Sequence, residues 1–217
     1  MDKRIGFELY LITDRKVAAP RGGLICVVEE ALKGGVRAIQ LREKDLDGRE
    51  LLRLARELRE LTRCYGALLF VNDRVDVALL SGADGVHLPE SSFSPSVVRR
   101  EFGRRLLIGV SCHSVDAVKK AEREGADFVT LGPVYDTPSK RPFGPPIGLE
   151  PLREASKAGI PVFALGGIKK EHIGEVISCG VHGVALISAI MAAKDIRKET
   201  EELIGEIRKN KKEVILK

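Results

Sequence analysis

Amide and basic side chains alternate along one short segment, which reads QLREK from Gln40 to Lys44. Residues at alternate positions of a β-strand share one face, so Gln40, Arg42 and Lys44 would point the same way. On an exposed strand they would form an ordinary solvated face. Inside a closed barrel the same three side chains would need partners, and this arrangement favours a ligand with strong negative charge.

An amide and a carboxylate follow the apolar run LLFV, as Asn72 and Asp73. The pair could cap a helix, because short polar side chains accept from the free N–H groups at helix starts. Beside Arg42 and Lys44, the Asp73 carboxylate could instead hold Mg²⁺ against a phosphate. We therefore expect a basic anion site that suits a diphosphate and its metal.

Backbone groups could form a second anion site. Gly167 ends the run PVFALGG, and Ile187 and Ser188 end GVALIS, at the start of a short predicted helix in ISAIMAAKD. Glycine lets the backbone approach a phosphate closely, and a helix start offers free N–H groups. Two ordinary loops are the alternative interpretation. The Pro-rich segment YDTPSKRPFGPPIG could close over either site with its polar residues Thr137, Ser139 and Lys140.

Eight short apolar runs would position these residues. They are LYLIT, AIQL, LLFVN, GVHL, LLIGV, FVTLG, PVFALGG and GVALIS, and stretches of helical periodicity separate most of them. Near-continuous apolar strands between helices are typical of a parallel sheet covered on both faces. Eight such strands predict an α/β fold, and they fit a single-domain (β/α)8 TIM barrel better than they fit an open sheet. The domain would span residues 1–217, with a basic C-terminal helix and tail from about residue 195.

The carboxyl ends of the strands form the active-site face of such barrels. There the fourth strand carries His87 and leads to Ser92, and the fifth gives Ser111, Cys112 and His113. A lone histidine is more often structural than catalytic, and Cys112 is most simply a small buried side chain.

The composition limits the classes of partner that the protein is expected to bind. The chain has 217 residues, 44% of them hydrophobic and 31% charged, which is typical of a soluble globular protein. Its net charge of +5 comes with a basic C-terminal segment, RKNKKEVILK, that lacks aromatic residues, so we expect no nucleic-acid partner. We also expect no membrane partner and a cytoplasmic location, because no run approaches 18 apolar residues. Small-molecule phosphates and diphosphates are the expected partners, and the sequence leaves a homo-oligomer open.

Six motifs, taken in order, resemble those of one family. QLREK, VND, GVSCHS, GADFVTLGPVYDTPSK, ALGGI and ALISAI are similar to segments of thiamine phosphate synthases and of their sister enzymes, the thiazole tautomerases. The resemblance runs from LYLITD to LISAI. It implies a transferase of thiamine biosynthesis, which joins a hydroxymethylpyrimidine diphosphate to a thiazole phosphate and releases diphosphate. Mg²⁺ and cationic side chains would stabilise the departing diphosphate.

The resemblance also implies a role for each matching residue. The pyrimidine diphosphate would bind at Gln40, Leu41, Arg42, Glu43, Lys44, Asn72, Ser111 and Lys140. The thiazole phosphate would bind at Thr137, Pro138, Ser139, Gly167, Ile187 and Ser188. Arg42, Lys44 and Lys140 would take part in catalysis, and Asp73 would be a ligand of Mg²⁺.

One position departs from the synthase pattern. Synthases usually have GQ and two acids after the fourth-strand histidine, and the last acid is the second Mg²⁺ ligand. Here the sequence LPESS places Ser92 at that position, and a neutral hydroxyl is a poorer ligand for a hard dication. The patterns LPxxSFSP and GPPIGL are more similar to the tautomerase, which needs no metal and in which His113 would be the acid/base.

The retained Gln40, Lys44 and Asp73 favour the synthase, because the tautomerase reaction has no use for a diphosphate site. The tautomerase is the first alternative, and a non-catalytic binder of thiamine-related phosphates is the second. A different sugar-phosphate barrel enzyme is more remote.

Overall fold

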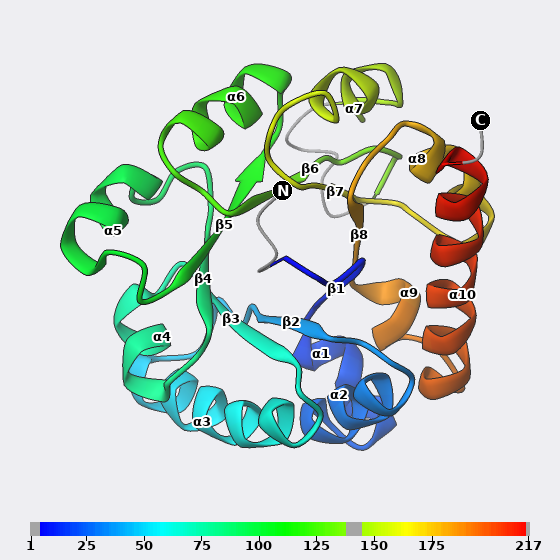
Figure 1. Cartoon of the computed structure of the whole chain (residues 1–217). Helices are drawn as coiled ribbons and strands as arrows, with labels where there is room; N and C mark the ends of the chain where they lie inside the picture. The colour runs from blue at the N-terminus through cyan, green and yellow to red at the C-terminus, as the bar shows by residue number, and fades with distance from the viewer. Residues whose placement is uncertain (1–4, 138–144, 216–217) are drawn as a thin grey trace.

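Eight parallel strands close into a barrel, and each strand pairs with its neighbours in chain order (Figure 1). A computed structural model describes residues 5–137 and 145–215. The predicted single-domain (β/α)8 barrel is thus confirmed. Each apolar run supplies one strand: β1 (Leu9–Ile12), β2 (Ala38–Leu41), β3 (Leu68–Asn72), β4 (Gly85–Leu88), β5 (Leu107–Cys112), β6 (Phe128–Leu131), β7 (Val162–Leu165) and β8 (Gly183–Leu186).

Helices surround the barrel (Figure 1). The main ones are α2 (Leu24–Lys33), α3 (Gly48–Cys64), α4 (Val75–Ser81), α5 (Pro95–Phe102), α6 (Val115–Arg123), α7 (Glu150–Ala155), α8 (Ile173–Ser178) and α10 (Ile196–Ile215). Shorter turns are α1 (Arg15–Ala18), η1 (Ala19–Arg21), η3 (Lys170–His172) and α9 (Ser188–Met191). Helix α9 is the short helix expected in ISAIMAAKD. The basic C-terminal helix is α10, which packs beside α8 and α2.

Aromatic side chains fill the barrel interior below the carboxyl ends of the strands. Phe7, Tyr10, Phe70, Phe128 and Phe163 form one buried cluster, with Phe7 and Phe163 stacked at 5.0 Å between ring centroids. Glycine makes room for these rings, since a Cβ at Gly85 would lie 2.5 Å from the ring of Phe70. The interior is therefore packed, and a ligand can enter only toward the carboxyl ends of the strands.

Two aspartates in the repeated GAD segments tie strands to helices. Asp84 accepts from the backbone N–H of Leu69 at 2.8 Å and from the guanidinium of Arg59 at 2.7 Å. Asp127 repeats the arrangement one strand pair further on, where it accepts from the N–H of Ile108 at 2.6 Å and from Arg99. The segment GAD, which occurs at residues 82–84 and 125–127, therefore marks the same strand-to-helix link at two places in the barrel.

Asp127→Ala is expected to lower the free energy of unfolding by about 3 kcal/mol. The Asp127 side chain is only 8% exposed, and its loss leaves the charge of Arg99 and the N–H of Ile108 without this partner. Denaturant unfolding curves measure the change. Glu101→Ala is the control, because Glu101 forms an exposed ion pair with Arg100 and should change stability by less than about 0.5 kcal/mol. Equal losses in the two variants would contradict this role of Asp127.

Candidate active site

The side chains of the segment from Gln40 to Lys44 lie in several different environments. Gln40 is 1% exposed and lies inside the barrel, and Arg42 is half-buried at its mouth. Leu41 packs in the outer core between the sheet and the helices. Lys44 is exposed. Because β2 ends at Leu41, only Gln40 of the three alternating polar residues lies on the strand, on the side opposite to Leu41. Arg42 follows the strand, and Lys44 lies in an exposed turn, so the prediction that all three share one inward face is wrong for Lys44.

Glu43 forms hydrogen bonds within the protein. Its buried carboxylate accepts from the hydroxyl of Thr13 at 2.7 Å and from the backbone N–H of Arg15 at 3.0 Å. The Thr13 hydroxyl in turn accepts from the N–H of Arg42 at 2.9 Å. This chain of bonds fixes the loop after β1 against the end of β2 and so positions the backbone that carries Arg42. Ligand contacts by Leu41 and Glu43 remain predictions, and their side chains have the structural contacts described here.

Asp73 follows β3 in a backbone conformation that is uncommon outside glycine, with φ +65°. Aspartate tolerates this region better than most residues do. Its N–H donates to the carbonyl of His87 at 2.9 Å, which joins the ends of β3 and β4. The helix α4 begins two residues later without a side-chain cap, so Asp73 is not an N-cap. The exposed carboxylate is held at the barrel mouth beside Asn72, which ends β3.

The side chain of Ser92 donates a hydrogen bond to Oδ1 of Asp73. The structure therefore brings together the two residues expected at the metal position. Within residues 5–137 and 145–215, no cluster of three or more His, Cys, Asp or Glu residues could hold a metal by itself. The donor set fits Mg²⁺ that takes one carboxylate from Asp73 and its other ligands from water and a diphosphate, which is the usual way proteins bind this ion.

A buried polar chain crosses the barrel below the mouth. Gln40 Nε2 donates to Tyr10 Oη at 3.3 Å, and Tyr10 Oη lies 3.4 Å from His87 Nδ1. His87 Nε2 lies 3.0 Å from the hydroxyl of Ser111 and 3.5 Å from that of Thr130. Burial, with a smaller contribution from the charge of Arg42, lowers the pKa of His87 to about 3. The imidazole is therefore neutral at physiological pH.

The sequence did not single out Tyr10 or Thr130 as site residues. The signal was a polar residue in the middle of an apolar strand, LYLI for Tyr10 and FVTL for Thr130. In an ordinary sheet such a residue would face solvent, and only closure of the barrel turns it inward.

His113 and Cys112 differ in what they can do. Nδ1 of the exposed His113 donates to the carbonyl of Gly132 at 2.6 Å, so the neutral ring presents an unprotonated Nε2. Cys112 is buried, and burial raises the pKa of its thiol to about 12, so it stays a thiol rather than a nucleophilic thiolate. Ser92, Ser111 and Cys112 also line a groove of about 430 Å³ between the β4–α5 loop and α6.

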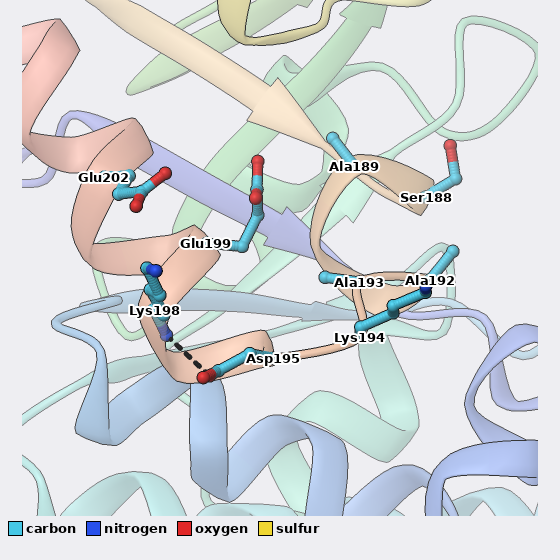
Figure 2. Close-up of a pocket in the computed structure, with 9 residues that line it drawn as sticks. All are labelled: Ser188, Ala189, Ala192, Ala193, Lys194, Asp195, Lys198, Glu199 and Glu202. Atoms are coloured by element: carbon cyan, nitrogen blue, oxygen red, sulfur yellow. Dashed lines mark hydrogen bonds between the residues drawn. The ribbon is translucent and has the colours of Figure 1, made fainter.

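Backbone N–H groups lie at the positions where the sequence predicts the second anion site. Gly167 has φ +68°, and a Cβ there would lie 2.7 Å from Cβ of Tyr135. Ile187 precedes the first residue of α9, Ser188, whose exposed side chain is drawn in Figure 2. The N–H groups of Gly167, Ser188 and Ala189 donate to no backbone acceptor in the part of the chain that the structure describes. They are free to donate to a phosphate.

A hollow of about 540 Å³ lies on the outer side of α9, against α10 (Figure 2). Its charged residues are the bases Lys194 and Lys198 and the acids Asp195, Glu199 and Glu202. Acids outnumber bases there, so the charged side of this hollow does not suit a phosphate, and the predicted anion site is confined to the backbone at the start of α9.

The segment expected to close over the sites is only partly described. Thr137 is half-buried after β6. Pro138, Ser139 and Lys140 lie outside the described residues, so their predicted roles stay predictions.

The closed barrel, with cationic, amide and carboxylate side chains at its mouth, defines a (β/α)8-barrel protein of a kind suited to phosphorylated small molecules. A sequence model of the thiamine monophosphate synthase family matches residues 9–190. The chain belongs to this family, as the motifs predicted.

Relatives and a solved structure agree with the family. The chain is 54% identical to the "Putative thiamine-phosphate synthase" of Geobacter sulfurreducens, over 93% of this chain and 95% of that protein. It is 46% identical to the thiamine-phosphate synthase of Pyrococcus furiosus, over 94% and 96%. The solved structure of a thiamine phosphate pyrophosphorylase from Pyrococcus furiosus superposes with a TM-score of 0.86, at 43% identity, over 94% and 96% of the two chains.

Proposed function

We propose that this protein is a thiamine phosphate synthase, a transferase of thiamine biosynthesis. The observation that carries the proposal is the mouth of the barrel, where Arg42 follows β2, the strand of the buried Gln40, and Asn72 and Asp73 end and follow its neighbour β3. A cation, amides and a carboxylate suit a diphosphate with its metal, which a simple isomerisation does not need. The names of the relatives point to the same activity.

The reaction divides into two bond changes. The C–O bond between the pyrimidine methylene and the diphosphate breaks, and the electron pair leaves with the diphosphate. The thiazole ring nitrogen then forms a C–N bond to the pyrimidine cation. Arg42, Lys44 and Lys140 would stabilise the charge on the diphosphate, and the backbone at Gly167 and Ser188 would orient the thiazole phosphate.

Asp73, with Ser92 beside it, would hold Mg²⁺, which when bound neutralises charge on the diphosphate. The work of the chain itself is to place the two substrates and to keep water from the cation. The expected location is the cytoplasm. None of the helices that the structure describes is long and apolar enough to span a membrane. Self-association remains a prediction.

Ser92→Asp is expected to lower the Mg²⁺ concentration needed for half-maximal coupling by about tenfold, because a second carboxylate joins Asp73. The assay measures thiamine phosphate formed from both substrates during a Mg²⁺ titration. Ser91→Asp is the matched control, since Ser91 is exposed and adjacent. The same shift in both variants would mean a general charge effect. No thiamine phosphate from the unmodified protein at saturating substrates would refute the synthase proposal.

The tautomerase remains the second candidate because His113 presents a free Nε2 beside the barrel mouth. If this is the activity, His113→Ala should slow aromatisation of the thiazole phosphate by about 10²-fold, the usual worth of a general acid or base. The ultraviolet change of the thiazole ring reports the rate. An unchanged rate would exclude His113 as the acid/base. Tight thiazole phosphate binding without turnover of either kind would instead indicate a binder.

A further inference from the structure

The carbonyl end of the short helix α9 is capped by a side chain from a distant part of the sequence. Nε of Arg21 donates to the carbonyl of Ala193 at 3.0 Å, and Nη2 donates to that of Ala192 at 2.5 Å. These two nitrogens lie on one edge of the planar guanidinium, which fits two neighbouring acceptors as a rigid fork, unlike an ammonium group. Nη1 donates to the carbonyl of Val17 at 3.2 Å. One side chain thus joins the end of α9 to α1, which lies against it.

The backbone holds Arg21 at a defined point. Arg21 is the last residue of η1, and Pro20 in the first turn of η1 restricts the backbone before it. Gly22 and Gly23 follow with φ +88° and +91°, which glycine adopts without steric cost, and the chain turns directly into α2. The N–H of Gly23 donates to the carbonyl of the fully buried Ala18 at 3.3 Å. The turn that carries Arg21 is therefore fixed to the hydrophobic core.

Helix α9 depends on contacts at its side and at its end. It has four residues, and isolated helices of fewer than about 12 residues are marginal in water. Ile190 and Met191 are fully buried and fix one side of α9 in the core. The guanidinium holds the carbonyls of Ala192 and Ala193 at the end (Figure 2), where a cation also stabilises the helix dipole. Loss of this contact would therefore free one end of the helix.

We propose that Arg21 is a positioning residue for the thiazole phosphate, because by holding the end of α9 it fixes the N–H groups of Ser188 and Ala189 at the start. A helix rises about 1.5 Å per residue, so the carbonyl end of α9 lies only about 6 Å from these N–H groups. A tilt or opening at one end of so short a helix moves the other end. All three guanidinium nitrogens donate to backbone carbonyls, so Arg21 acts through α9. The inference rests on the proposed function, which places the thiazole phosphate at Ser188.

Amide hydrogen exchange tests, without substrate or activity, whether Arg21 holds α9. The N–H of Met191 donates to the carbonyl of Ile187 at 2.9 Å, and that of Ala192 donates to the carbonyl of Ser188 at 3.0 Å. Arg21→Lys keeps the positive charge but not the fork, so both amides should exchange at least about tenfold faster as α9 opens. Unchanged exchange of the two amides would overturn the proposal.

Arg37→Lys is the matched control. Nη1 of Arg37 donates to the carbonyls of Leu32 and Val36 at the end of α2, at 3.2 and 2.7 Å. Arg37 immediately precedes β2, so it lies at the end of the barrel opposite to the proposed substrate sites. Its replacement removes a comparable contact, yet exchange in α9 and the affinity for both substrates should not change.

Calorimetry measures the affinity of each variant for thiazole phosphate and, with Mg²⁺, for the hydroxymethylpyrimidine diphosphate. Arg21→Lys should weaken thiazole phosphate binding by about tenfold, the lower part of the range for hydrogen bonds to a charged group. It should change the affinity for the diphosphate by less than about twofold, because that site is predicted at the ends of β2 and β3, away from α9. A merely structural role would weaken the binding of both ligands alike.

Three calorimetric results would overturn the proposal: full thiazole phosphate affinity in Arg21→Lys, equal weakening of both ligands, or an equal loss in Arg37→Lys. Faster hydrogen exchange confined to residues 19–23 would also overturn it, because α9 would then hold the loop rather than the reverse. If the unmodified protein binds no thiazole phosphate, the proposed function fails and the role of Arg21 in phosphate binding fails with it. Hydrogen exchange in α9 would then still decide whether Arg21 holds the helix.

Discussion

Asp73→Ala is expected to lower kcat/KM for coupling by about 10³-fold, the upper part of the range for removing one preorganised electrostatic group. Asp73 is the carboxylate that the β3–α4 turn places at the barrel mouth, with its N–H bonded to His87 and its Oδ1 to Ser92. Asp73 carries the only charge of the two described residues expected at the metal position, so its loss would leave the neutral Ser92 there alone. Steady-state assays across a Mg²⁺ titration measure the effect, and excess Mg²⁺ should restore only part of the rate.

Asp45→Ala is the matched control for Asp73. Asp45 is an exposed carboxylate whose ion pairs go to Arg15 and Lys16, and these cations hold its pKa well below its usual value. Its removal should change the coupling rate less than about twofold, since exposed ion pairs contribute little. A comparable loss in both variants, or no loss in Asp73→Ala, would remove Asp73 from the metal position.

Gly167→Ala is expected to weaken thiazole phosphate binding by about 10²-fold. The left-handed backbone costs a side chain about 1–2 kcal/mol. In addition, the new Cβ would lie 2.7 Å from Cβ of Tyr135 and 2.8 Å from the carbonyl of Asp136. The loop must move to relieve these contacts, and the N–H groups that would face the phosphate move with it. Calorimetric titration with thiazole phosphate measures the loss.

Gly66→Ala separates the backbone cost of the left-handed conformation from the steric contacts of the new Cβ. Gly66 has φ +60°, close to that of Gly167, but no atom lies within 4 Å of its added Cβ. It should lower stability by a similar backbone cost and leave thiazole phosphate affinity unchanged. If Gly167→Ala lost stability but kept its affinity, the backbone at Gly167 would not be a phosphate site.

The inner and outer faces of β2 show how far the sequence could specify the site. The alternation in QLREK predicted correctly that Gln40 and Leu41 differ in direction. It gave no sign that the Glu43 carboxylate would accept hydrogen bonds from Thr13 and Arg15, because those partners lie about 30 positions away in the chain. The same limit applies to Asp73, which the sequence placed near a metal position but whose bond to Ser92 depends on how two loops meet.

The sequence by itself determined the barrel, the family and the positions of the polar residues at strand ends. It could do so because strand and helix periodicity, glycine placement and ordered motifs are local properties of the chain. Only the tertiary structure decided which polar residues act together. Tyr10 and His87 lie 77 positions apart, and each alone is a polar residue within an apolar strand. Closure of the barrel turns both inward, excludes water, and leaves them each other as hydrogen-bond partners.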